Sequence, residues 1–344
     1  MASDGAVSDA PAREAQPSGG HRTQFADVVG RWAFLVVFAL VVMVFWAMRP
    51  DTFGTLGNLA IIINRAAIPL ILGCAVTLVL SCSEFDLSGP NLADFGSIVI
   101  GVLVTTGGMQ SGAGPWLAVA AGLLCTLAFG AVTGAAVTYG RVPSFVASLA
   151  VGSAAAGMEL ATQSRIESGM KQIVTIALPD QIRNLNTTTL LWTNIRLSVL
   201  IAVGVALSIW VTLRFTVFGR HVLAIGGNAD AAYLAAVPIT RVRLIVFAVA
   251  GLLAGVAGLL GLAERGYFTG ASPPLLLQSY TAAFLGTAVL ALRRFTIGGT
   301  AAAVLFLGVM SNGLGLLNQP TWIVSVVNGT VLLTAVVLTR GRHR

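Results

Sequence analysis

The sequence predicts an all-α polytopic membrane protein, a bundle of about ten membrane-spanning helices with a short helix in a cytoplasmic loop. Of its 344 residues, 56% are hydrophobic and only 10% are charged, against roughly 25% charged residues in soluble proteins. The apolar residues form long runs, and one spanning helix needs about 20 of them. A soluble core cannot hold so much apolar side chain, so the excess must face lipid.

The N-terminal segment differs from the rest of the chain. Residues 1–28 are rich in Ala, Ser, Gly, Pro and Asp and have no apolar periodicity, which is typical of a disordered tail. Asp4, Asp9 and Glu14 interrupt the basic-then-apolar order of a signal peptide. We expect a disordered cytoplasmic tail over residues 1–28 and a transmembrane domain over residues 29–344.

Apolar runs follow one another through the remaining sequence. Lipid offers no partner to backbone polar groups, so long continuous runs of this kind cross a membrane as helices. We expect spans at about 32–48, 58–80, 91–107, 115–138, 144–162, 197–213, 244–263, 278–292, 298–317 and 321–339.

The distribution of Arg and Lys supports an even number of spans. If the N-terminus is cytoplasmic, thirteen basic residues fall in cytoplasmic segments, six fall in outer segments and Arg65 lies inside a span. This bias satisfies the positive-inside rule. Removing one span would place the basic C-terminal tail outside, so we expect ten spans with both termini cytoplasmic.

Two connections are long. The outer one, about 163–196, combines charged residues with an Asn-Leu-Asn-Thr-Thr-Thr stretch at 184–189. We expect it to carry short amphipathic helices, which either receive a partner from outside or form an ordered lid.

The inner connection, about 214–243, contains a short capped helix. Asn228 is a good N-cap, Asp230 in the first turn suits the positive helix end, and Pro238 ends the run. A helix of about two turns is not stable alone in water, so another element must hold it. The small apolar docking face that the helical spacing produces comprises Ala231, Leu234 and Ala235.

The sequence contains no recognisable catalytic or nucleic-acid-binding constellation. The histidines lie in basic flanking segments, Cys74, Cys82 and Cys125 have no metal-like spacing, and basic residues are scattered between apolar runs. The single lysine, Lys171, belongs to no P-loop. Uphill transport would therefore draw its energy from an ion gradient or from a separate ATPase chain.

Four ionisable residues lie in or between the apolar runs, where an unpaired charge costs several kcal/mol. Arg65 and Glu159 share a depth near the outer face and form either a structural ion pair or a polar contact for a solute. Glu84 and Asp86 lie in a stretch with Gly and Pro. That composition favours a broken helix lining a polar cavity; the alternative is a solvated turn at the membrane face.

Several strings carry a family resemblance over residues 57–340. The string 218–228 reads Phe-Gly-Arg-His-Val-Leu-Ala-Ile-Gly-Gly-Asn and precedes an alanine-rich helix. Residues 141–149 read Arg-Val-Pro-Ser-Phe-Val-Ala-Ser-Leu, and residues 84–88 read Glu-Phe-Asp-Leu-Ser. Here the chain resembles the permease subunits of ribose-, xylose- and galactose-type ABC importers, which have Gly-Ile-Asp-Leu-Ser at the last of these strings.

The resemblance implies a permease of a bacterial inner membrane that imports a sugar or similar polar solute. It implies a second permease copy, identical or a sibling, two ATP-binding subunits and an extracytoplasmic solute-binding protein. ATP and Mg²⁺ would bind to the ATPase, and this chain would bind no cofactor. The resemblance assigns ATPase coupling to the inner helix and its start, which comprise Gly227, Asn228, Asp230, Ala231, Ala232, Leu234 and Ala235.

The resemblance also places the region around Asp86 near the translocation path. The candidate path residues are Arg65, Glu84, Asp86, Ser88, Glu159 and Asn312. The chain departs from the family at Glu84 and Phe85, and Leu277 stands where an acid is usual, which leaves the solute open. An alternative function is a stand-alone ion-coupled carrier that uses the intramembrane charges as a relay.

Overall fold

The computed structural model describes residues 20–105, 108–169, 178–189, 194–266, 272–289 and 294–340. These residues form fourteen α-helices and, between Thr189 and Arg196, one isolated β-bridge. Helices at the ten predicted spans are α1 (Gly20–Met48), α3 (Leu56–Leu80), α4 (Gly89–Thr105), α5 (Gly114–Thr138), α6 (Ser144–Gly169), α8 (Leu197–Phe215), α11 (Ile239–Arg265), α12 (Ser272–Val289), α13 (Ile297–Leu316) and α14 (Thr321–Arg340). The short helices are α2 (Pro50–Phe53), α7 (Asp180–Thr187), α9 (Val217–Gly227) and α10 (Ala229–Leu234).

The predicted class, an all-α polytopic membrane protein, is confirmed. Within the described residues, α3, α5, α6, α8, α11 and α13 are each long and apolar enough to cross a membrane. Shorter apolar stretches lie in α1, α4 and α14. The outer connection contains α7, an amphipathic helix that buries Ile182 and Leu185, as the sequence predicts.

The first helix begins earlier than predicted. Residues 1–19 lie outside the described residues, but α1 starts at Gly20, so residues 20–28 are helical rather than part of a tail. The physical reason is that extending a helix costs little once its apolar part has formed. Pro17, the last proline before the span, precedes the first residue of α1, so no proline interrupts this extension.

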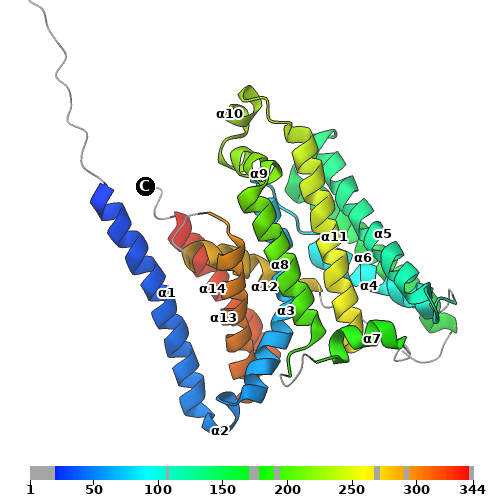
Figure 1. The fold of residues 1–344 in the computed structure, drawn as a ribbon, viewed down its shortest axis with the longest axis horizontal. Coiled ribbons are helices and arrows are strands. Elements are labelled where there is room, and N and C mark those ends of the chain that lie inside the picture. Colours follow the sequence, from blue (N-terminus) through cyan, green and yellow to red (C-terminus); the bar gives the residue numbers. More distant parts are fainter. Residues whose placement is uncertain are drawn as a thin grey trace, which may run out of the picture.

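The helices form two groups on either side of α3 (Figure 1). One group contains α4, α5, α6 and α11, and the other contains α12, α13 and α14, with α1 at its edge. The apolar windows of α3 and α11 are each 67% buried, which makes these two helices the centre of the bundle. In Figure 1, α9 and α10 lie at one end and α2 and α7 lie at the other.

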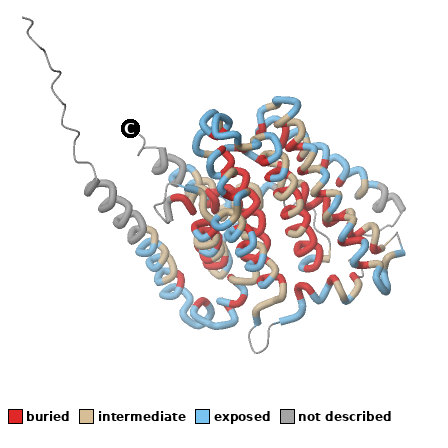
Figure 2. Tube along the Cα trace, turned by 45° about the horizontal axis from the view of Figure 1, so that its top comes forward, coloured by how far each residue is buried: buried red, intermediate tan, exposed pale blue. Residues whose placement is uncertain are grey.

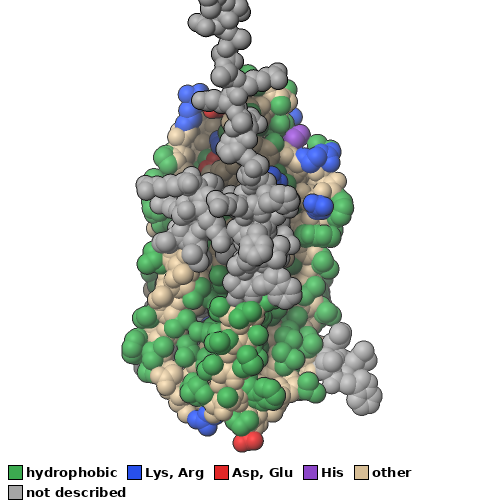
Figure 3. Space-filling view, turned by 90° about the vertical axis from the view of Figure 1, so that its left-hand side faces the viewer, with side chains coloured by type: hydrophobic (Ala, Val, Ile, Leu, Met, Phe, Trp, Pro, Cys, Tyr) green, Lys and Arg blue, Asp and Glu red, His purple; other side chains and the backbone are tan. Residues whose placement is uncertain are grey.

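Burial and side-chain type follow this arrangement. Buried residues lie in the middle of the bundle, while much of α1 is exposed (Figure 2). The exposed side of α1 is apolar and includes Leu40, Met43 and Trp46. Hydrophobic side chains cover much of the described surface in Figure 3, and basic side chains gather toward the α9–α10 end.

Glycines bring α5 and α11 into backbone contact. A Cβ atom at Gly251 would lie 2.4 Å from the Thr126 carbonyl oxygen and 2.9 Å from the Gly130 Cα atom. A Cβ atom at Gly130 would lie 2.4 Å from the Phe247 carbonyl oxygen. Small residues permit such close helix packing in membranes. The spacing of glycines along these two predicted spans therefore reflects an actual helix crossing.

Adding one methyl group at this crossing should destabilise the bundle. We expect Gly251→Ala to lower the free energy of unfolding by about 1–3 kcal/mol, as overpacking does in tight cores, because rigid backbone surrounds the added atom. Thermal unfolding of the detergent-purified protein measures the effect. Gly204→Ala is the control, since a Cβ atom there meets nothing within 4 Å. Equal stability of the two variants would contradict this packing.

Candidate functional site

The predicted inner helix is present as α10, and its ends carry the expected caps. The Asn228 Oδ1 atom accepts a hydrogen bond from the Ala231 N–H group at 3.0 Å, and Asp230 lies in the first turn. At the other end Ala236 adopts φ 58°, and the Val237 N–H group donates to the Ala232 carbonyl at 3.0 Å. This is the left-handed termination that ends many helices.

The docking face of α10 is exposed. Leu234 is 86% exposed, Ala231 and Ala235 are exposed as well, and Tyr233 is 73% exposed. Only Ala232 is buried, at 4%. A leucine held this far into solvent on a two-turn helix is available to a partner.

Helix α9, which the sequence interpretation left inside a loop, supports α10. The Thr216 side chain accepts a hydrogen bond from the Gly219 N–H group at 3.1 Å and caps α9. Val222 and Ile225 are buried, with exposed fractions of 0% and 2%. The signal was available, because a threonine cap followed by apolar residues three apart indicates an amphipathic helix.

The predicted helix break between the second and third spans is confirmed. Helix α3 ends at Leu80, and α4 begins at Gly89. Ser83 adopts φ 57°, and the Glu84 N–H group donates to the Val79 carbonyl at 3.2 Å. We call residues 81–88 the connecting segment.

Side chains from other helices satisfy the backbone of the connecting segment. Ser144 Oγ accepts from the Phe85 N–H group at 3.1 Å. The Tyr280 hydroxyl accepts from the Asp86 N–H group at 3.0 Å and donates to the Asp86 carbonyl at 2.9 Å. Irregular backbone inside a membrane protein requires partners of this kind.

Asp86 and Ser88 are brought together. The Asp86 Oδ1 atom accepts from the Ser88 N–H group at 2.9 Å and from Ser88 Oγ at 2.5 Å. Asp86 is 4% exposed and Ser88 is 0% exposed. The carboxylate thus fixes the turn that leads into α4, and its place on a solute path stays a prediction.

Glu84 pairs with an arginine that the sequence interpretation did not connect to it. Glu84 Oε1 lies 2.7 Å from Nε of Arg243, near the start of α11. The geometry is not that of an aligned hydrogen bond, so the contact is an ion pair. Glu84 is only 8% exposed. The alternative of a solvated turn at residues 84–86 is therefore wrong, because both carboxylates are buried against neighbouring helices.

The suggested ion pair between Arg65 and Glu159 is absent. Both residues are described, but the ion pairs between described residues are Arg183–Asp180 and Arg243–Glu84. Arg65 is exposed on α3, whereas Glu159 is 6% exposed and its carboxyl interacts electrostatically with that of Asp94. Equal depth does not place two side chains on facing sides of their helices. An acid inside the span predicted at 91–107 was the signal for Asp94.

Asn312 lies apart from the other candidates. It is 7% exposed in α13, and its Oδ1 atom has no hydrogen-bond partner in the described part of the chain. The hydrogen bonds of the Asp86 side chain and backbone go to Ser88 and Tyr280 rather than to Asn312, so the six candidates do not form one hydrogen-bonded cluster within the described part of the chain.

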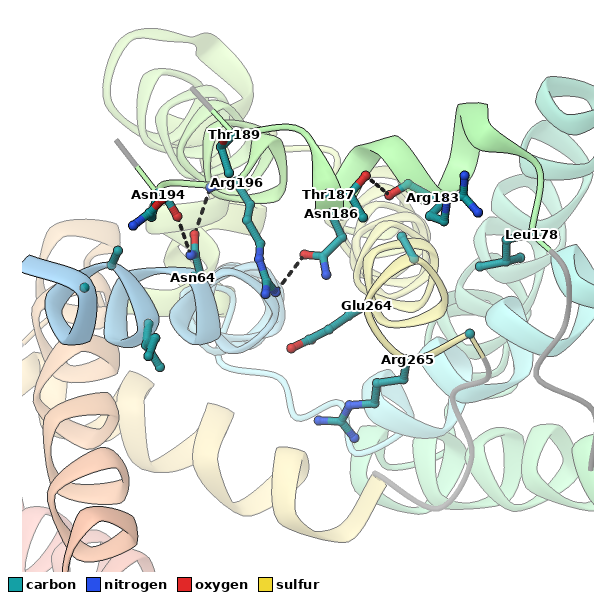
Figure 4. Close-up of a pocket in the computed structure, with 15 residues that line it drawn as sticks. Asn64, Leu178, Arg183, Asn186, Thr187, Thr189, Asn194, Arg196, Glu264 and Arg265 are labelled. Atoms are coloured by element: carbon teal, nitrogen blue, oxygen red, sulfur yellow. Dashed lines mark hydrogen bonds between the residues drawn. The ribbon is translucent and has the colours of Figure 1, made fainter. Parts of the chain in front are cut away.

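A pocket of about 940 Å³ opens at the α2–α7 end (Figure 4) and contains none of the candidate path residues. Asn64 organises one wall: its Nδ2 atom donates to the Asn194 carbonyl at 2.8 Å, and its Oδ1 atom accepts from the Arg196 N–H group at 2.9 Å. Arg196 Nη1 also donates to Asn186 Oδ1 at 3.4 Å. Glu264 and Arg265, from the end of α11, line the same pocket. The sequence interpretation missed this pocket, although an Asn beside Arg65 was a signal.

Removing the cap of α10 should loosen that helix. We expect Asn228→Ala to cost about 1 kcal/mol of helix stability, which corresponds to roughly fivefold faster amide hydrogen exchange in α10. Exchange measured by mass spectrometry tests this. Asn228→Ser keeps a capping oxygen and is the control; identical exchange in the Ala and Ser variants would contradict the capping role.

Comparison with known proteins places this geometry in a family. Residues 58–336 match the family described as "Branched-chain amino acid transport system / permease component". The ribose import permease protein RbsC of Escherichia coli K12 is 30% identical over 312 residues, which cover 88% of this chain and 92% of that protein. The probable ABC transporter permease protein YphD of the same strain is 33% identical over 313 residues, which cover 88% of this chain and 87% of that protein.

The L-arabinose ABC transporter permease protein AraH of Azospirillum brasilense is 29% identical, over 92% of this chain and 89% of that protein. No solved structure matches the chain significantly. The family match covers most of the sequence and includes α10, the connecting segment and the buried acids. Ribose and L-arabinose permease proteins are similar to this chain over most of their length. The chain therefore belongs to the permease family described as "Branched-chain amino acid transport system / permease component".

Proposed function

We propose that this chain is the membrane-spanning permease subunit of an ATP-binding cassette importer that moves a sugar or similar small polar solute inward. The observation that carries the proposal is α10, a capped helix whose apolar side chains project into solvent at one end of the bundle. A separate ATPase would hold this helix in a groove, an interaction that short amphipathic helices commonly make.

The surroundings of α10 favour the cytoplasmic side for this end. Arg214 at the end of α8, Arg220 in α9 and Arg241 in the first turn of α11 are exposed. Basic residues are in excess on the cytoplasmic side of membrane proteins. This orientation would place both termini in the cytoplasm and α7 outside, in a bacterial inner membrane. ATP and Mg²⁺ would then bind to the partner ATPase.

The proposal of a sugar rests on relatives that match nearly their full length. Proteins named as ribose and L-arabinose permeases cover about nine-tenths of this chain, whereas the family description names branched-chain amino acids. We favour the sugar because the named relatives match along the whole chain. Two permease copies would rock against each other and alternate access, and a solute-binding protein would deliver solute at the α7 end.

A charge on the exposed face of α10 should uncouple the transporter. We expect Leu234→Asp to reduce ATP-dependent uptake at least tenfold, because an acid cannot replace a leucine in an apolar groove, where the loss of a buried anchor residue costs 2 kcal/mol or more. Uptake into proteoliposomes that contain the complete complex measures this, and co-purification reports ATPase binding.

Leu56→Asp is the matched control. Leu56 is 84% exposed at the start of α3, at the opposite end of the bundle, so this variant should keep full ATPase binding. Normal uptake by Leu234→Asp would contradict the proposal. Gradient-driven uptake by the chain reconstituted alone would instead support the ion-coupled carrier.

A further inference from the structure

Three contacts fasten the connecting segment to the elements around α10. A Cβ atom at Gly226 would lie 2.1 Å from the Ser81 carbonyl oxygen, so the two backbones touch. Ser83 Oγ donates a hydrogen bond to the Gly226 carbonyl at 2.8 Å. The third contact is the ion pair between Glu84 and Arg243.

The three contacts involve residues on both sides of α10 in the sequence. Gly226 precedes α10 at the end of α9, and Arg243 follows it in the second turn of α11. Both flanks of the helix are thus joined to the first four residues, 81–84, of the connecting segment. Any displacement of α10 that moves its flanks must move this segment or break these contacts.

The contacts differ in the force they can carry. A backbone contact such as Gly226 against Ser81 resists compression, but it does not resist separation. A hydrogen bond and an ion pair resist separation as well. The side chains of Glu84 and Arg243 are only 10% and 28% exposed, and charges this shielded are screened much less than surface pairs. Of these three contacts, the Ser83 hydrogen bond and the Glu84 ion pair are therefore the two that can transmit a pull.

The other end of the connecting segment reaches the interior. Asp86 is bonded to Tyr280 of α12 and to Ser88, which accepts the first backbone bond of α4 from Leu92 at 2.9 Å. Helix α4 in turn packs against α6 and carries Asp94, whose carboxyl interacts electrostatically with that of Glu159 on α6. A movement of Glu84 thus reaches the junction of α4, α6 and α12.

We propose that Glu84 is a positioning residue that links α10 to the interior helices through Arg243. When α10 moves away from the bundle, this link pulls the connecting segment and α4 with it. The inference rests on the proposed function, since α10 must be driven by an ATPase. Glu84 acts through the ion pair and does not contact the solute.

The test measures solute taken up per ATP hydrolysed by the complete complex in proteoliposomes. In Glu84→Gln we expect this ratio to fall about fivefold, an effect within the range of coupled neighbouring pairs, with ATPase binding and basal hydrolysis unchanged. A merely structural role would lower the amount of assembled complex and leave the ratio intact. Asp51→Asn, which neutralises an exposed carboxylate on α2 at the opposite end, should leave the ratio unchanged.

A double-mutant cycle assigns the effect to the pair. If Glu84 acts through Arg243, the Glu84→Gln/Arg243→Gln double variant should have the same ratio as Glu84→Gln, and Ser83→Ala should show a smaller loss. A normal ratio in Glu84→Gln would overturn the inference, as would independent, multiplying losses in the double variant. Failure of the wild-type chain to bind an ATPase would overturn the proposed function instead, so the two failures are distinguishable.

Discussion

The backbone at the end of α9, just before α10, lies directly against the backbone of the segment that joins α3 and α4. At Gly226 this approach leaves no room for a side chain, because a Cβ atom would overlap the Ser81 carbonyl oxygen. The constraint places α10 next to the only irregular segment between α3 and α4. The hydrogen bond from Ser83 to the Gly226 carbonyl crosses this contact, and the ion pair of Glu84 with Arg243 joins the same segment to the start of α11. The flanks of the surface helix α10 thus contact the segment that carries the buried Glu84 and Asp86.

Local signals in the sequence predicted much of this arrangement. Apolar runs located ten helices, the Asn228 cap and Pro238 located α10, and Gly and Pro near Asp86 located the helix break, because each depends on residues close together in the chain. The partners of those residues could not be predicted in the same way. Arg243 meets Glu84, and Tyr280 meets Asp86, only because α11 and α12 pack beside the connecting segment.

The failed pairing of Arg65 with Glu159 shows the same limit from another side. The predicted order and bounds of the spans give the depth of a residue in the membrane, but not the direction in which its side chain points. Glu159 is buried in α6 and interacts electrostatically with Asp94 of α4, while Arg65 is exposed on α3. A single residue such as Asn64 could signal the pocket around it but not its walls, because these combine α3, α7 and the end of α11 with Arg196, the residue before α8. The pocket is lined by amide and arginine side chains, among them Asn64, Arg183 and Arg196.

Photo-crosslinking from Tyr233 of α10, in cells that contain the complete transport system, would test the central claim most directly. Tyr233 is 73% exposed beside Leu234, and a photoreactive amino acid at this position should join the chain to an ATP-binding subunit, with a yield that changes during ATP turnover. Crosslinking to an extracytoplasmic protein, or to no second polypeptide at any stage of turnover, would contradict the account.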